Sequence, residues 1–310
     1  METAQQPSTK AASGRQGTVL KIAGGFALDA DFSPDGKTLA VASVLTASNP
    51  GSGSIELWDV ATGHIRTTLS DTGAAVSKVA YSSDGRTIAS AGNHGTVRLW
   101  DVASGQIRQT LDEPKPGTEY WMTALAYSPD GKFVASVDTM WNVVTGQRTP
   151  IVPTFTNAMY KRCIAFSPDG TRLLVCIDGY VDVLDVATGK VVVNYKGHRA
   201  VVSDAAFSPD GKTVASSSED GITQLWDPGT GQDVATLQDA GGLAAFSPDG
   251  KHLVTGGSSG PKLWQVDSRA AVATLAGHSD RITSAAFSPD GKTVATSSLD
   301  KTVRLYPAEG

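Results

Sequence analysis

Cysteine is almost absent from this sequence, and this scarcity excludes a small fold that is held together by several disulfides. Only Cys163 and Cys176 occur among the 310 residues, so stability has to come from a hydrophobic core. The two cysteines flank one predicted turn on adjacent strands, where two buried thiols are favoured over a redox pair. An apolar fraction of 40% and a charged fraction of 18% suffice for such a core.

Long apolar runs and clustered positive charge are also missing. No segment approaches the roughly 20 apolar residues that span a bilayer, and residues 1–17 carry no apolar signal core. The net charge of −5 disfavours a nucleic-acid partner, because phosphate binding requires a positive field. We therefore expect a cytoplasmic, monomeric protein with neither a membrane nor a nucleic-acid partner.

Patterns that carry catalysis or metal binding are sparse as well. None of the five histidines belongs to a His-Glu-x-x-His motif or to a cluster with zinc spacing. No nucleophile elbow, phosphate-binding glycine loop or calcium-binding loop is present. The sequence therefore predicts no catalytic residue, no metal site and no cofactor.

What the sequence has in abundance is one turn. An aromatic-Ser-Pro-Asp-Gly motif recurs at intervals of 39 to 49 residues, and only the second copy departs from it, with Ser83 in place of proline. This period is close to the roughly 40–45 residues of a four-stranded propeller blade. The motif glycines are Gly36, Gly85, Gly131, Gly170, Gly211, Gly250 and Gly291.

One repeat shows how each unit is built. In residues 201–237, turn residues separate four predicted strands at 201–207, 213–217, 222–226 and 232–237. The first strand of every repeat ends on an aromatic residue, has an apolar residue two positions earlier and mostly alanine between them. Since strand residues alternate between two faces, the apolar face packs between blades and the small residues crowd around a common axis. The fold class is therefore all-β, with strand one lining a central channel.

Further motifs identify a family. Trp58-Asp59, Trp100-Asp101 and Trp226-Asp227 end third strands, and Gly197-His198 and Gly277-His278 precede first strands. Over residues 18–306 the chain resembles the WD-repeat β-propeller family of bacterial type. The resemblance implies a closed seven-bladed β-propeller with four antiparallel strands per blade, and in most relatives a scaffold for protein or peptide partners. It also implies that His198, Asp220 and Trp226 form a buried structural network.

The two ends of the repeat region predict how the ring closes. The last repeat stops after its third strand, while residues 18–23 precede the first repeat in the position of a fourth strand. We expect this segment to complete the last blade and to remove an open edge. Residues 1–16 are predicted to be a flexible tail, and residues 17–310 the propeller.

The entrance to strand one is the most variable position of the repeat. Aromatic and basic residues gather there in some units, and such residues are typical of interface hot spots. An insertion at residues 47–53 adds to the individuality of the first unit. The predicted partner-binding residues are Phe26, Tyr120, Trp121, Met159, Tyr160, Lys161, Arg162 and Arg281.

Three functions are consistent with these patterns. The leading hypothesis is a non-catalytic scaffold whose loop rim binds a protein or peptide. The alternative is a lyase or hydrolase in the channel, where Asp29, Asp204 and Lys78 share one column and Asp31 faces the axis. The third is a sensor module of a signalling assembly.

Overall fold

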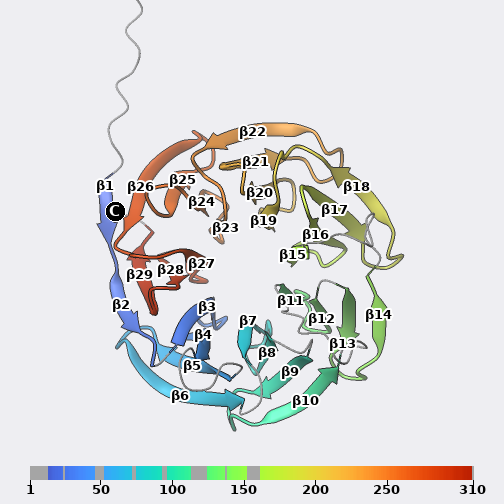
Figure 1. Ribbon diagram of the computed structural model, residues 1–310. Helices are drawn as coiled ribbons and strands as arrows, with labels where there is room; N and C mark the ends of the chain where they lie inside the picture. The colour runs from blue at the N-terminus through green and yellow to red at the C-terminus, as the bar shows by residue number, and fades with distance from the viewer. Residues whose placement is uncertain are drawn as a thin grey trace, which may run out of the picture.

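The computed structural model describes residues 13–23, 25–45, 52–71, 75–92, 96–112, 124–136, 138–151 and 161–308. Within these ranges the chain forms 29 β-strands and no helix, so no helix there could cross a membrane. Seven sheets are arranged as blades around a central channel (Figure 1). The predicted seven-bladed, all-β propeller is therefore confirmed.

We number the blades 1–7 in chain order, and in each the first strand lies innermost (Figure 1). Blade 1 contains β3 (Gly25–Phe32), β4 (Thr38–Leu45), β5 (Gly53–Asp59) and β6 (His64–Asp71). Blade 2 contains β7 (Val76–Tyr81), β8 (Thr87–Gly92), β9 (Thr96–Asp101) and β10 (Ile107–Asp112). Blade 3 has shorter strands: β11 (Leu125–Tyr127), β12 (Phe133–Ser136), β13 (Thr139–Asn142) and β14 (Arg148–Pro150).

The remaining blades repeat this order. Blade 4 contains β15 (Lys161–Phe166), β16 (Arg172–Ile177), β17 (Tyr180–Asp185) and β18 (Val191–Tyr195). Blade 5 contains β19 (Val202–Phe207), β20 (Val214–Ser218), β21 (Ile222–Trp226) and β22 (Asp233–Gln238). Blade 6 contains β23 (Ala244–Phe246), β24 (His252–Thr255), β25 (Lys262–Gln265) and β26 (Ala270–Ala276). Blade 7 contributes β27 (Ile282–Phe287), β28 (Thr293–Ser298) and β29 (Thr302–Pro307).

The N-terminal segment joins two blades. Strand β2 (Thr18–Lys21) pairs antiparallel with β29 and is the outermost strand of blade 7. Strand β1 (Ser13–Gln16) pairs in parallel with β26 and adds a fifth strand to blade 6. In Figure 1 both strands run along the outside of the ring beside the C-terminal blades. Residues 13–16 of the expected flexible tail, residues 1–16, thus form a strand, while residues 1–12 lie outside the described ranges.

Two side chains fasten this segment to its neighbours. The Arg15 guanidinium donates to the carbonyl oxygen of Pro307 at 2.7 Å, which links β1 to the end of β29. The Glu56 carboxylate accepts the backbone N–H of Ala23 and the indole N–H of Trp58, each at 3.1 Å. The segment is thereby bonded to blade 1 as well as to blades 6 and 7.

The core lies between blades rather than within one of them. Seven clusters of buried side chains each join two adjacent blades, as the alternation in strand one predicts. In the cluster between blades 7 and 1, Leu20 and Ile22 of the N-terminal segment pack with Phe32, Trp58 and Val303. Ring closure therefore buries apolar surface at this junction as it does at the others.

The repeated turn is held by its own side chains. In the first copy, the Ser33 hydroxyl donates to the Asp35 carboxylate at 2.6 Å and accepts the backbone N–H of Thr38 at 3.0 Å. Gly36 has a φ of +70°, where a residue with a Cβ would be strained. The same serine-to-aspartate bond recurs in the other six copies.

Each turn also meets the turn of the next blade. A Cβ added at Gly36 would lie 3.5 Å from Cδ of Pro289, across the junction of blades 7 and 1. A Cβ at the other motif glycines would contact a proline of the preceding blade in the same way. Gly131 is the exception among the seven, because a Cβ there would meet the Ser83 hydroxyl instead of a proline. One rim of the propeller is therefore a closed ring of turns whose residues contact one another and hold the blades together.

Candidate functional site

The channel is lined by polar side chains that satisfy the backbone of neighbouring blades. A carboxylate oxygen of Asp29 accepts the N–H of Val79 at 3.1 Å, and Asp204 accepts the N–H of Ala244 at 3.0 Å. The Ser284 hydroxyl accepts the N–H of Ala30 at 3.1 Å. All three acceptors stand three residues before the aromatic end of strand one. The same position of the repeat therefore supplies a hydrogen bond between neighbouring blades at three of the blade junctions.

The remaining candidates for acid–base chemistry lie in the same cavity of about 420 Å³. The Asp31 carboxylate accepts the N–H of Tyr81 at 2.7 Å. The Lys78 ammonium lies 3.5 Å from the Asp29 carboxylate. The structure thus brings Asp29, Asp31, Lys78 and Asp204 to one channel, as predicted, and gives each carboxylate a backbone N–H to accept. Ser284 lies in the same column but was not among the residues selected from the sequence.

Two of these carboxyl groups should make stability depend on pH. Burial raises the pKa of Asp31 to about 7 and that of Asp204 to about 6. Because the folded protein then holds each proton more tightly than the unfolded chain does, this contribution to stability is present at low pH. It is lost as the pH rises from about 4 to about 7.

Asp31→Asn is accordingly expected to melt at a higher temperature than the parent at pH 8, and at nearly the same temperature at pH 4. The amide oxygen still accepts the Tyr81 N–H, but no charge is buried. Asp210→Asn is the control of opposite sign, because the Ser208 hydroxyl lowers the pKa of Asp210 and its ionised form is favoured. Parallel melting profiles for parent and Asp31→Asn across this range would contradict the assignment.

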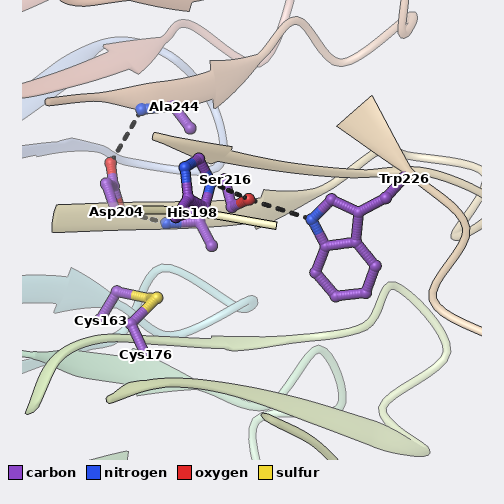
Figure 2. Close-up of a disulfide and its surroundings, with 8 residues drawn as sticks. Cys163, Cys176, His198, Asp204, Ser216, Trp226 and Ala244 are labelled. Carbon is purple, nitrogen blue, oxygen red and sulfur yellow. Dashed lines mark hydrogen bonds between the residues drawn. A yellow bond between two sulfur atoms is a disulfide. The ribbon is translucent and has the colours of Figure 1, made fainter. Parts of the chain in front are cut away.

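A disulfide occupies the equivalent channel position of blade 4. Cys163 and Cys176 are directly opposite each other on β15 and β16, with Cα atoms 5.0 Å apart, and their sulfurs are bonded (Figure 2). The expectation of two buried thiols is therefore wrong. Both residues are buried, and Cys163 lies on the channel wall. The turn between them places the two side chains on one face of a strand pair, which is the geometry that a cross-link requires.

In blade 5, His198 and Trp226 of the predicted network meet at a fourth residue, Ser216 (Figure 2). The Trp226 indole N–H donates to the Ser216 hydroxyl at 3.0 Å, and that hydroxyl lies 2.8 Å from Nε2 of His198. Nδ1 of His198 lies 3.1 Å from the Asp220 carboxylate, which also accepts the N–H of Arg199 at 3.0 Å. The arrangement in which His198 donates from Nδ1 and accepts at Nε2 gives every member a partner.

Blade 7 keeps most of the same arrangement. His278 lies 2.8 Å from both Asp300 and the Thr296 hydroxyl. Tyr306 replaces the tryptophan and donates instead to the carbonyl oxygen of Ala276 at 3.0 Å. A hydroxyl on the second strand, from Ser216 in blade 5 and from Thr296 in blade 7, thus belongs to the arrangement in both blades, and the predicted network of blade 5 did not include it.

Asp220→Ala is expected to destabilise the protein by about 1–3 kcal/mol, the usual cost of leaving buried polar groups without partners. The substitution removes the acceptor of the His198 ring, whose side chain is 0% exposed. Chemical denaturation measures the difference, with Lys212→Ala, at a side chain that is 83% exposed, as a neutral control. An unchanged denaturation midpoint for Asp220→Ala would show that the network contributes nothing to stability.

The predicted partner-binding residues do not converge on one patch among the described residues. The Phe26 ring lies 5.7 Å from the Lys301 ammonium, between blades 1 and 7. Arg162 forms an ion pair with Glu219 at 2.6 Å, between blades 4 and 5. Arg281 is exposed beside blade 6. Lys161 begins β15, whereas Tyr120, Trp121, Met159, Tyr160 and most of the 47–53 insertion lie outside the described residues.

Known proteins share the repeat. Residues 62–101, 189–227 and 269–306 match the family model described as WD domain, G-beta repeat. A stretch of 149 residues, 44% of the chain, is 37% identical to an uncharacterized WD repeat-containing protein of Synechocystis sp. and covers 41% of it. A stretch of 118 residues, 36% of the chain, is 30% identical to cross-pathway control WD-repeat protein 2 of Flammulina velutipes and covers 38% of it. The chain thus spans about two fifths of each relative.

Proposed function

Because this chain belongs to the WD-repeat family of β-propellers, we propose that it is a non-catalytic scaffold that binds a protein or peptide through one loop rim. WD-repeat propellers are generally protein-interaction scaffolds. The rim in question is the one at which the innermost strands begin. Arg281, which directly precedes β27, lies on it, and the other residues selected from the sequence are expected there.

The contrast between the two rims carries the proposal. On one rim, seven copies of the same turn use their serine, aspartate and glycine internally, and most turns abut a proline of the preceding blade. On the other rim, the residue that precedes strand one differs from blade to blade, from buried Ala75 to exposed Arg281. A rim whose loops differ can change its contacts without disturbing the blades, and that freedom is typical of a binding surface.

Affinity measurements on rim variants test this function. A partner is first identified by cross-linking and then titrated against the purified parent protein. Trp121→Ala and Tyr160→Ala are expected to weaken binding by about thirtyfold or more, the effect of losing an aromatic anchor. Asp130→Ala, on the opposite rim, should leave affinity unchanged. Equal affinities for all three variants would move the binding site away from this rim.

The channel alternative gains no support, because each candidate carboxylate already accepts a backbone N–H. The sensor module, the monomeric state and the absence of membrane or nucleic-acid partners stay predictions. The cytoplasmic location also stays a prediction, and the disulfide supplies its test. Thiols are kept reduced in most cytosols, so alkylation of Cys163 and Cys176 when cells are lysed in denaturant with the alkylating reagent present would support that location, and their protection under those conditions would contradict it.

A further inference from the structure

A hollow of about 560 Å³ opens between blades 6 and 7 on the rim where the innermost strands begin. Its walls come from the loop before β23, the loop between β24 and β25, and the loop before β27. Main chain supplies much of this lining, at Gly241, Gly242, Gly256 and Gly257. Its volume is within the range of ligand pockets and is far larger than a single bound ion needs.

A shortened loop in blade 6 creates the hollow. Nine positions separate Leu237 from Phe246, whereas twelve separate the equivalent Tyr195 from Phe207 in blade 5. The missing residues include the glycine-histidine pair, so no histidine fills the rim of this blade. Strand β23 is correspondingly reduced to three residues, against six in β19. The hollow thus results from the loss of residues from one repeat, and that loss is encoded in the sequence.

Glycine keeps this surface open. A Cβ at Gly256 would overlap the carbonyl oxygen of Gly241, so the two segments approach as bare main chain. Gly241 itself stands where Val202 and Ile282 begin strand one in blades 5 and 7. Peptide groups of these glycines therefore line the hollow together with side chains such as those of Ser259 and Arg281, and they are suited to hydrogen bonding with another main chain.

The charged side chains that line this edge of the hollow are Asp280 and Arg281, and the Arg304 guanidinium lies against Gly277 of its wall. Among the described residues, Arg281 is exposed and its guanidinium takes part in no hydrogen bond or ion pair, while Nε of Arg304 is buried without an acceptor. A Cβ at Gly277, in the wall of the hollow, would overlap the Arg304 guanidinium. The Asp280 carboxylate accepts the backbone N–H of Arg281 at 2.6 Å. Burial lowers the pKa of His278, which is already bonded to Asp300.

We propose that this hollow binds an extended peptide that places an acidic side chain against Arg281. The peptide backbone lies along the glycine-lined wall, and its carboxylate forms a charge-assisted pair with the exposed guanidinium. This inference rests on the proposed function and assigns it a location and a class of partner. Blades 6 and 7 therefore form the docking site.

Three pools of fluorescent nonapeptides test the site by polarisation. Each pool has random flanks and a fixed central Glu, Gln or Lys. The Glu pool is expected to bind the parent protein at least about tenfold more tightly than the Lys pool. Arg281→Glu should reverse this preference, and Ser259→Trp, which projects a large ring from an exposed lining position, should weaken binding of every pool.

Two controls and a melting measurement guard against misfolding. Lys212→Glu repeats the charge change on the opposite rim, and Val192→Trp repeats the bulky substitution at an outer strand position that is 52% exposed. Neither should change affinity for the pools. Equal binding of Glu and Lys pools, unchanged binding by both site variants, or no binding below about 1 mM would overturn the proposal. If an identified partner tolerates Arg281→Glu and Ser259→Trp but is lost with Trp121→Ala, the rim function stands and this site is wrong.

Discussion

A protein that lacks residues 1–23 is expected to melt about 5–10 °C lower than one that lacks only residues 1–12. The deletion removes β1 and β2 together with Leu20 and Ile22, which are 2% and 6% exposed. Burial of two such side chains contributes about 3–6 kcal/mol, and a propeller of this size loses roughly 0.6 kcal/mol of stability per degree near its midpoint. The lost hydrogen bonds of two ladders add to this effect.

Two further variants separate the parts of this segment. A chain that begins at residue 17 should melt between the other two, because it loses only the β1 ladder and the Arg15 bond to Pro307. Leu20→Ala should cost about 2–5 kcal/mol. Val19→Ala, at the adjacent position that is 40% exposed, should cost little. Identical melting of the chains that begin at residues 13 and 24 would show that the segment does not hold the ring closed.

Reduction of the Cys163–Cys176 disulfide is expected to lower stability by about 3 kcal/mol, because the bond closes a short loop of the unfolded chain. Its 13-residue separation spans one strand-turn-strand unit, and the loss corresponds to a fall of about 5 °C in melting temperature. Thermal melts with and without a strong reductant measure the difference, and a thiol assay verifies that the buried bond has opened.

A variant without the bond provides the control. Cys163→Ala combined with Cys176→Ala should melt at the same temperature with and without reductant. An equal shift in parent and variant would mean that the reductant acts elsewhere. Two free thiols in the parent protein before reduction would contradict the disulfide itself.

The parts of the fold that sequence predicts well are those determined by neighbouring residues. The strands of blade 5 begin and end within one residue of their predicted limits, because proline, glycine and aspartate define each turn locally. Strand β1 could not be found in this way. Its residues Ser13–Gln16 show no apolar alternation, and their partner is the edge of β26, which lies some 260 residues further along the chain.

The functional predictions divide along the same line. Hydrogen bonds join the histidine, aspartate and tryptophan of blade 5 into the network that the family resemblance implied, but Ser216 carries no signature of its own and was missed. The cysteine pair was correctly placed on adjacent strands, yet its oxidation state depends on the register that sets Cys163 opposite Cys176. The hollow beside Arg281 arises from a deletion in the repeat, and residues that are absent are difficult to notice by motif.

The N-terminal segment that closes the ring affects how the protein folds during synthesis. Strand β2 leaves the ribosome early, but β29, its partner, begins at Thr302, about 280 residues later. At a translation rate of about 5–20 residues per second, the segment waits on the order of 15–55 s for that partner. Contacts at such separation form late and slowly. During this interval blade 7, which packs against blade 1 in the finished fold, has not yet been made. The ring therefore stays open for most of the synthesis of the chain.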